Sequence, residues 1–252
     1  MIDKTVGSVE DAVAGIQDGD TVMIGGFGPS GQPVELIDAL IAQGAKDLTI
    51  VNNNAGNGDV GLAALLAQKR VRKIICSFPR QADSWVFDEL YRAGEIELEL
   101  TPQGNLAERI RAAGAGIGAF FSPTGVGTEL AAGKEIRTID GKDYALEYPI
   151  RADFALVSGL KADRWGNVVY RETARNFGPI MATAATTTVV QVDELVELGD
   201  LDPEVVVTPG IFTDRVVAVG TRAWLDEDGT FVGGVTVDGQ PLDATDAKET
   251  AR

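Results

Sequence analysis

A glycine-rich loop is the part of the sequence best suited to bind a ligand. It reads Gly25-Gly26-Phe27-Gly28-Pro29-Ser30-Gly31, after the apolar run Val22-Met23-Ile24 and before an apolar stripe at helical spacing. Backbone without Cβ atoms lets a ligand approach the N–H groups, and the start of a following helix favours negative charge. The pattern therefore indicates either a site for an anionic ligand or a tight strand-to-helix turn that binds nothing.

One known use of such a loop fits poorly. Gly26 to Gly31 satisfies the dinucleotide pattern G-x-G-x-x-G, which also requires an acidic residue about twenty positions later, at the end of the next strand. That place is held by Asn52-Asn53-Asn54, and the next acidic residue is Asp59. Pro29 also removes one N–H donor. A nicotinamide-dependent oxidoreductase is therefore kept only as an alternative.

The sequence excludes several catalytic chemistries by what it lacks. It contains no histidine and a single cysteine, Cys76. Ser-His-Asp hydrolysis, imidazole acid–base catalysis and His- or Cys-based zinc sites therefore cannot be assembled from this chain alone. Carboxylates, amides, arginines and backbone donors remain, and we predict no metal site and no permanently bound cofactor.

Charge and hydropathy limit the partners. The 252 residues carry a formal net charge of -16, which argues against nucleic acid or an anionic membrane surface as a partner. The N-terminus shows no apolar signal-peptide region, and no uninterrupted apolar run approaches about 18 residues. We expect a cytoplasmic protein that acts on small molecules.

The elements around the loop alternate between strand and helix. Strands are expected near 22–24, 48–51, 73–76, 96–100 and 119–121, with helices between them, one capped by Ser84 and another beginning near Asn105. This alternation predicts an α/β fold with a largely parallel sheet wrapped by helices. Asp140-Gly141 predicts a hairpin, an antiparallel excursion, before further strands at 154–157, 168–170, 189–192 and 205–207.

The C-terminal end differs in composition. We expect a single domain over residues 1–220, because no repeat or long linker interrupts it. Residues 221–252 are polar and acidic, with a second Asp-Gly pair at Asp238-Gly239. They are expected to form a small hairpin or to be partly disordered.

Taken together, five ordered blocks resemble the first subunit of the family I coenzyme A-transferases. The first is the stretch from Asp18 to Pro33 that holds the glycine loop. The others are Asn53-Asn54-Ala55-Gly56, Leu100-Thr101-Pro102-Gln103-Gly104-Asn105-Leu106-Ala107-Glu108-Arg109, Phe121-Ser122-Pro123-Thr124-Gly125-Val126-Gly127-Thr128 and Ala174-Arg175-Asn176-Phe177. The resemblance spans Ile2 to Val219. It implies the family's fold, which is similar to that of the NagB and RpiA proteins.

Within the family, the segments 52–58 and 77–84 look most similar to the branch that acts on 3-oxoadipate. The branch that acts on acetoacetate, or on another 3-oxo acid, is the alternative. The resemblance implies transfer of CoA from succinyl-CoA to the 3-oxo acid through a glutamyl-CoA thioester, with CoA thioesters as substrates.

The resemblance also implies a partner polypeptide. In the family, the attacking glutamate comes from the second subunit, within a Ser-Glu-Asn-Gly stretch that this sequence does not contain. We therefore expect a heterodimer or an α₂β₂ heterotetramer that is active only when both polypeptides are present. A non-catalytic binding module on the same fold is the remaining alternative, because fold alone does not fix function.

By similarity, the Gln103 amide is expected to donate to the oxyanion of the reacting thioester, with Asn53 or Asn54 nearby. The loop Gly25 to Gly31 is expected to face CoA. Arg80 is a candidate for binding the distal carboxylate of 3-oxoadipate, since a guanidinium holds a carboxylate in a two-pronged fork. The structural alternatives are a helix cap for Gln103, loop hydrogen bonding for the asparagines and a solvated surface position for Arg80.

Overall fold

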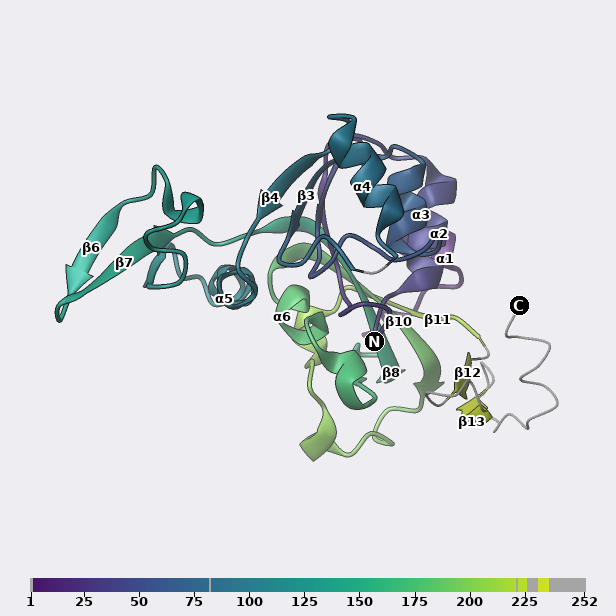
Figure 1. The fold of residues 1–252 in the computed structure, drawn as a ribbon. Coiled ribbons are helices and arrows are strands. Elements are labelled where there is room, and N and C mark those ends of the chain that lie inside the picture. The colour runs from purple at the N-terminus through teal and green to yellow at the C-terminus, as the bar shows by residue number, and fades with distance from the viewer. Residues whose placement is uncertain (1, 82, 221, 226–230, 236–252) are drawn as a thin grey trace.

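The centre of the protein is a twisted parallel β-sheet (Figure 1). The structure is a computed structural model that describes residues 2–81, 83–220, 222–225 and 231–235. The strand order is β11-β10-β8-β1-β2-β3-β4, and every neighbouring pair along it is parallel. The strands are β1 (Thr21–Ile24), β2 (Leu48–Val51), β3 (Val71–Cys76), β4 (Glu97–Leu100), β8 (Ala152–Asp163), β10 (Ala185–Val196) and β11 (Arg215–Ala218). A short β9 (Val168–Val169) pairs antiparallel with β8. The predicted α/β fold is confirmed.

Helices cover both faces of this sheet. One face carries α1 (Val9–Val13), α2 (Val34–Gln43), α3 (Leu62–Ala67) and α4 (Trp85–Arg92), and the other carries α5 (Gln103–Gly114) and α6 (Gly178–Ala182). Val22 and Ile24 belong to the core beneath α1–α4, while Met23 between them belongs to the core beneath α5 and α6. Successive side chains of a strand point to opposite faces, so a sheet buried on both sides needs a continuous apolar run.

A three-stranded antiparallel sheet, which we call the arm, projects from this body (Figure 1). Its order is β5-β7-β6, with β5 at Phe120–Ser122, β6 at Ile136–Ile139 and β7 at Lys142–Glu147. Asp140 and Gly141 have φ of 50° and 77°, as a type I′ turn requires, so the hairpin prediction is confirmed. The strand expected at 119–121 is present, but its inclusion in the parallel series is wrong because β5 pairs antiparallel with β7.

Two local predictions are corrected by the structure and a third is refined. The strand expected at 205–207 is absent, because Pro203–Val205 form a 3₁₀ turn. The helix expected from Asn105 begins two residues earlier, at Gln103, with Pro102 before it. Ser84 is the N-cap residue of α4, as predicted, but its side chain makes no capping hydrogen bond; its Oγ donates to the Gly56 carbonyl at 3.0 Å and accepts from the Gln81 N–H at 2.9 Å.

Further 3₁₀ turns lie in the connections, at Glu129–Ala131, Glu172–Arg175 and Gly210–Phe212. At the C-terminal end, β12 (Arg222–Leu225) and β13 (Phe231–Val235) pair antiparallel. The proposed boundary between residues 1–220 and an acidic tail falls where residue 221 is not described, and the tail segments 226–230 and 236–252 also lie outside the described residues. Within the described part of the chain, no helix has the length and apolar character that crossing a membrane requires.

The strand order reverses direction beside β1. From β1 the chain adds β2, β3 and β4 in turn on one side. It then returns and places β8, β10 and β11 on the other side of β1. The Gly25 N–H, just after β1, donates to the Leu156 carbonyl of β8 at 2.9 Å. Open parallel sheets bind ligands beyond the carboxyl ends of their strands at such a reversal. The glycine loop leaves β1 at this point.

Candidate active site

The predicted site residues other than Arg80 meet because each follows the carboxyl end of a neighbouring strand. The glycine loop follows β1, Asn53 and Asn54 follow β2, and Gln103 follows β4, with Ser77 after β3. Carboxyl ends of parallel strands lie along one edge of a sheet, so residues far apart in sequence come into contact there. Asn53 and Asn54 are buried, whereas Gln103 is exposed.

Hydrogen bonds link these residues into what we call the amide network, consisting of Gly28, Asn53, Asn54, Ser77 and Gln103. The Gln103 Nε2 donates to Asn53 Oδ1 at 2.8 Å, and the Ser77 hydroxyl donates to the same oxygen at 2.7 Å. Asn53 Nδ2 donates to Asn54 Oδ1 at 3.2 Å, and the Gly28 N–H donates to that oxygen at 2.7 Å. The network thus joins the loops after four adjacent strands.

The glycine loop owes its shape to tight turns and close packing. Gly26, Gly28 and Gly31 have positive φ, and a Cβ on Gly31 would lie 2.2 Å from the Ala174 carbonyl oxygen. Of the six N–H groups between residues 25 and 31, the four of Gly25, Phe27, Gly28 and Ser30 donate within the protein. Most of the loop's N–H groups therefore form hydrogen bonds within the protein and are not available to a ligand.

A cleft of about 370 Å³ opens between this loop and the first turns of α5 and α6. Its lining is Phe27, Gln103, Gly104, Ala107, Asn176, Phe177 and Ile180. Phe27 is 48% exposed, so its ring forms one wall. Gln103 and Gly104 open α5, where unpaired backbone N–H groups and the helix dipole favour negative charge. The cleft combines an apolar wall with amide donors.

A larger cleft of about 910 Å³ shares Asn176 with the first. It is lined by Tyr170, Glu172, Thr173, Arg175, Asn176, Glu204, Val205 and Val207. Burial raises the pKa of Tyr170 to about 12 against the opposing effect of its hydrogen bond with Thr208, so this phenol stays protonated. We place the candidate site in the smaller cleft, because that cleft contains both Phe27 and Gln103.

The residue that follows β2 is not suited to bind the ribose of a dinucleotide. Asn52 Nδ2 donates to the Ile24 carbonyl at 2.6 Å, and Asn52 Oδ1 accepts from the Asn54 N–H at 2.8 Å. A buried amide stands where a ribose-binding carboxylate would be needed. Asn54 Nδ2 is buried without a hydrogen-bond partner, so one donor beside the glycine loop is unused within the chain.

Arg80 lies apart from the amide network. Its Nε donates to Asp88 Oδ1 at 2.5 Å, and its side chain is 55% exposed. The adjacent Gln81 reaches the glycine loop, with its Nε2 3.9 Å from the position a Cβ would take on Gly28. The Arg80 guanidinium is engaged by one carboxylate, and Arg80 is not among the lining residues of either cleft.

The Cys76 thiol and a possible metal site are the other chemistries to consider. Burial raises the pKa of the Cys76 thiol to about 12, which makes a thiolate nucleophile unavailable. Among the residues the structure describes, no group of three or more His, Cys, Asp or Glu side chains is placed to hold a metal ion.

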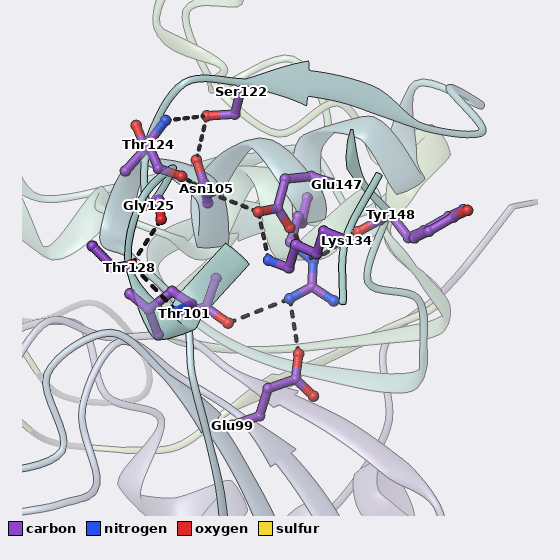
Figure 2. A network of polar contacts seen from close by, with 12 residues as sticks. Glu99, Thr101, Asn105, Ser122, Thr124, Gly125, Thr128, Lys134, Glu147 and Tyr148 are labelled. Carbon is purple, nitrogen blue, oxygen red and sulfur yellow. Dashed lines mark hydrogen bonds and ion pairs between the residues drawn. The ribbon is translucent and has the colours of Figure 1, made fainter. Parts of the chain in front are cut away.

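A second polar network fixes α5, the helix that carries Gln103 (Figure 2). We call its charged members, Glu99, Arg109, Lys134 and Glu147, the ionic network. Glu147 of the arm is 2% exposed, and its Oε1 accepts from Lys134 at 2.7 Å and from Asn105 Nδ2 at 3.0 Å. Arg109 of α5 donates to Glu99 Oε1 at 2.8 Å and lies 3.9 Å from Glu147 Oε2.

The ionic network also perturbs titration. Burial disfavours ionisation of Glu99, but hydrogen bonds from Lys73 and Arg109 outweigh it and lower the pKa of this carboxyl. Lys73 donates to Glu99 Oε2 at 2.8 Å. Since these contacts join β3, β4, α5 and the arm, they hold the helix start at a fixed place beside the sheet edge.

Sequence reasoning missed two contributors to the site. Ser77 carried no signal of its own, because a serine after a strand is common. Asn176 belongs to one of the blocks that resemble the family, but the sequence assigns it no role; its Nδ2 donates to the Ser30 carbonyl at 3.0 Å, and the residue lines both clefts. The position of Ser77, first after a strand and level with Asn53, is the pattern that could have identified it.

Comparisons with known proteins fit this geometry. A family model described as "Coenzyme A transferase" matches residues 6–219. A Pseudomonas putida protein, named as the A subunit of 3-oxoadipate CoA-transferase, is 68% identical over 223 residues, covering 88% of this chain and 96% of that protein. A Bacillus subtilis protein, named as the A subunit of a probable succinyl-CoA:3-ketoacid coenzyme A transferase, is 49% identical over 214 residues, covering 85% and 89%.

Among solved structures, an acyl-CoA transferase from Escherichia coli O157:H7 (YdiF), in a thioester complex with CoA, has a TM-score of 0.75 at 24% identity. The match covers 86% of this chain and 47% of that one, so this chain spans about half of the larger protein. At that identity the likeness supports the fold alone.

Proposed function

Because this chain belongs to the coenzyme A transferase family, we propose that it is the first of the two subunits of an enzyme that transfers CoA from succinyl-CoA to 3-oxoadipate. The observation that carries the substrate assignment is the 68% identity, over 96% of its length, to a relative named for that role. The relative named for a 3-ketoacid substrate is 49% identical. The products would be 3-oxoadipyl-CoA and succinate.

In this proposal the reacting carboxylate comes from the second subunit. The sequence resemblance implies a glutamate of that partner as nucleophile, and this chain supplies the surface against which it reacts. Attack of that carboxylate on the acyl carbon of succinyl-CoA moves an electron pair onto the thioester oxygen. The Gln103 Nε2 has a second N–H beyond the one bonded to Asn53, and it donates to that oxygen as the charge develops.

Return of the electron pair breaks the C–S bond, which expels the CoA thiolate and leaves a succinyl-glutamyl anhydride. The thiolate then attacks the glutamyl carbonyl of the anhydride, which releases succinate and leaves the glutamyl-CoA thioester; the same steps in reverse with 3-oxoadipate give 3-oxoadipyl-CoA.

The cleft supports this role for Gln103. The start of α5 places the helix dipole on the same side as the amide, so both favour the developing oxyanion. The segment from Gly25 to Gly31 is the proposed CoA-facing loop. Because most of its N–H groups are used internally, its contribution is the exposed Phe27 ring and a fixed backbone contour. CoA is a substrate here and leaves with the product.

Arg80 is the proposed contact for the distal carboxylate of the acceptor. Asp88 engages its Nε, and the terminal nitrogens of a guanidinium can bind a second carboxylate. We propose a cytoplasmic location for the complex, supported by the single buried cysteine, which shows no reliance on disulfides.

The test is an assay of the chain purified together with its partner polypeptide. We expect the pair to form 3-oxoadipyl-CoA from succinyl-CoA and 3-oxoadipate, at a higher kcat/KM than with acetoacetate. Either polypeptide on its own should be inactive. A preference for acetoacetate would reassign the acceptor, and absence of transfer to any 3-oxo acid would overturn the proposal.

A second measurement locates the covalent intermediate. The pair is incubated with succinyl-CoA alone, and both polypeptides are weighed by mass spectrometry. We expect the added mass of CoA on the partner and an unchanged mass for this chain. An adduct on a side chain of this polypeptide would contradict the division of roles.

A further inference from the structure

Ser77 makes a contact that no ordinary loop serine needs. It is the first residue after β3, and its Oγ donates to the side-chain oxygen of Asn53 at 2.7 Å. The Oγ also lies 3.2 Å from the Asn53 backbone carbonyl, which already accepts from the Ser77 N–H at 3.2 Å and from the Phe78 N–H at 3.0 Å. The shorter contact of the hydroxyl is with the side chain of Asn53, a residue that is 1% exposed.

The orientation of the Asn53 carboxamide decides which atom of the Gln103 carboxamide, Nε2 or Oε1, faces Asn53. As observed, Asn53 Oδ1 meets two donors, Ser77 and Gln103, and its Nδ2 meets the Asn54 oxygen. A rotated Asn53 would present its N–H groups to Gln103 and draw the Gln103 oxygen inward. The Gln103 nitrogen would then leave the place from which it can donate to a bound oxyanion.

Two contacts favour the observed orientation. Asn54 Oδ1 accepts from the Gly28 N–H at 2.7 Å and can only accept, so it favours the Asn53 Nδ2 that donates to it at 3.2 Å. At the opposite end, the Ser77 hydroxyl donates to Asn53 Oδ1 at 2.7 Å, which is the shorter of the two contacts. Ser77 therefore adds to a preference that Asn54 begins.

We propose that Ser77 is a positioning residue for the transfer reaction, whose hydroxyl, together with the Asn54 oxygen, holds Asn53 so that Gln103 keeps its nitrogen at the oxyanion position. The inference rests on the proposed function of Gln103. Ser77 does not line the cleft, so it acts through Asn53.

The experiment is a double-mutant cycle on the two-subunit complex. We expect S77A to lower kcat about tenfold, the effect of one hydrogen bond of about 1.4 kcal/mol, with KM for both substrates within twofold of the wild type. S77T keeps the hydroxyl and should restore kcat to within threefold. In the Q103A background, S77A should cause no further loss, because its target is gone.

Ser84→Ala is the matched control, since Ser84 is also a buried loop serine but bonds Gly56 and Gln81 instead of Asn53. It should lower the melting temperature while the kcat of the folded complex stays within twofold. If S77A fails to fold, S77C, which preserves volume but donates weakly, replaces it in the cycle.

The outcomes separate the two proposals. A tenfold loss from S77A that persists in the Q103A background, a loss expressed in KM, or no loss at all would overturn the role of Ser77 and leave the proposed function intact. If Q103A itself left kcat unchanged, the oxyanion role would fail, and the role of Ser77 would fail with it.

Discussion

The amide network at the sheet edge and the ionic network beneath the arm solve the same problem with different groups. Both join segments from separate strands through polar side chains, with a buried residue at the centre, Asn53 in one and Glu147 in the other. The amide network has no formal charge, whereas the ionic network surrounds a carboxylate that is 2% exposed with two cations. Buried charges left unpaired cost far more than unpaired amides. Damage to the first should therefore appear in turnover, and damage to the second in stability.

The largest expected effect tests the catalytic side of this contrast. Gln103→Ala should lower kcat of the two-subunit complex about 100- to 1,000-fold, the usual loss for one oxyanion donor, and leave the melting temperature nearly unchanged. Steady-state kinetics and thermal unfolding measure the two quantities. Gln68→Ala, at the exposed end of α3, is the matched control and should change neither. If Gln103→Ala left kcat unchanged, the assignment of the amide network to turnover would be wrong.

The second effect tests the stability side. Glu147→Ala removes the carboxylate shared by Lys134 and Asn105, and we expect a loss of about 3 kcal/mol in the free energy of unfolding. Arg109 keeps its contact with Glu99, which limits the cost. Urea denaturation of the variant and of the wild type measures this loss in the free energy of unfolding.

The control for Glu147 is Glu135→Ala. Glu135 is exposed and pairs with Arg137 at 2.9 Å, so its removal should cost at most about 0.5 kcal/mol. Equal losses from the two substitutions would show that burial does not distinguish these carboxylates.

A third test removes Arg80, the charged side chain of this chain that we propose contacts the substrate. Arg80→Ala should raise KM for 3-oxoadipate about tenfold and leave KM for acetoacetate within twofold, because only 3-oxoadipate has a distal carboxylate. Arg92→Ala is the control, since Arg92 also approaches Asp88, at 3.7 Å. An equal change for both acceptors would remove Arg80 from the selectivity role.

The smallest effect concerns pH. The pKa of Glu99 is lowered in the folded protein, so its ion pairs stabilise the fold above its unfolded pKa of about 4.3 and lose that contribution as pH falls through the folded value. Glu99→Gln should therefore cost about 1 kcal/mol at pH 7. The difference from the wild type should shrink in unfolding experiments below about pH 4, and a constant difference would argue against an ionic origin.

The contrast also explains what sequence could reveal. Apolar runs such as Val22-Met23-Ile24 identify strands buried on both faces, so the parallel sheet was predictable. Phe120–Ser122 carries the same local signal but pairs within the arm, because strand partners are set by tertiary contacts. The β-branched residues at 205–207 favour a strand, yet Pro203 and the cap by Asp202 impose a 3₁₀ turn.

The site shows the same limit. Asn53 and Gln103 could be proposed because the family resemblance marks them, and their positions after strands bring them together. The role of Ser77 needed the geometry, because hydrogen bonds among loops depend on distances that no local pattern encodes. The early start of α5 at Gln103 likewise depends on Pro102, whose missing N–H suits the boundary of a helix.

The lining of the smaller cleft has a consequence for kinetics. All of its residues, Phe27, Gln103, Gly104, Ala107, Asn176, Phe177 and Ile180, have side chains that neither gain nor lose a proton in water at ordinary pH. A pH dependence of the transfer rate would then report groups outside this lining, such as those of the partner polypeptide or of the acids being exchanged. Measuring the transfer rate as a function of pH would therefore give information about the titrating groups of the partner polypeptide, because the lining of this cleft contributes none.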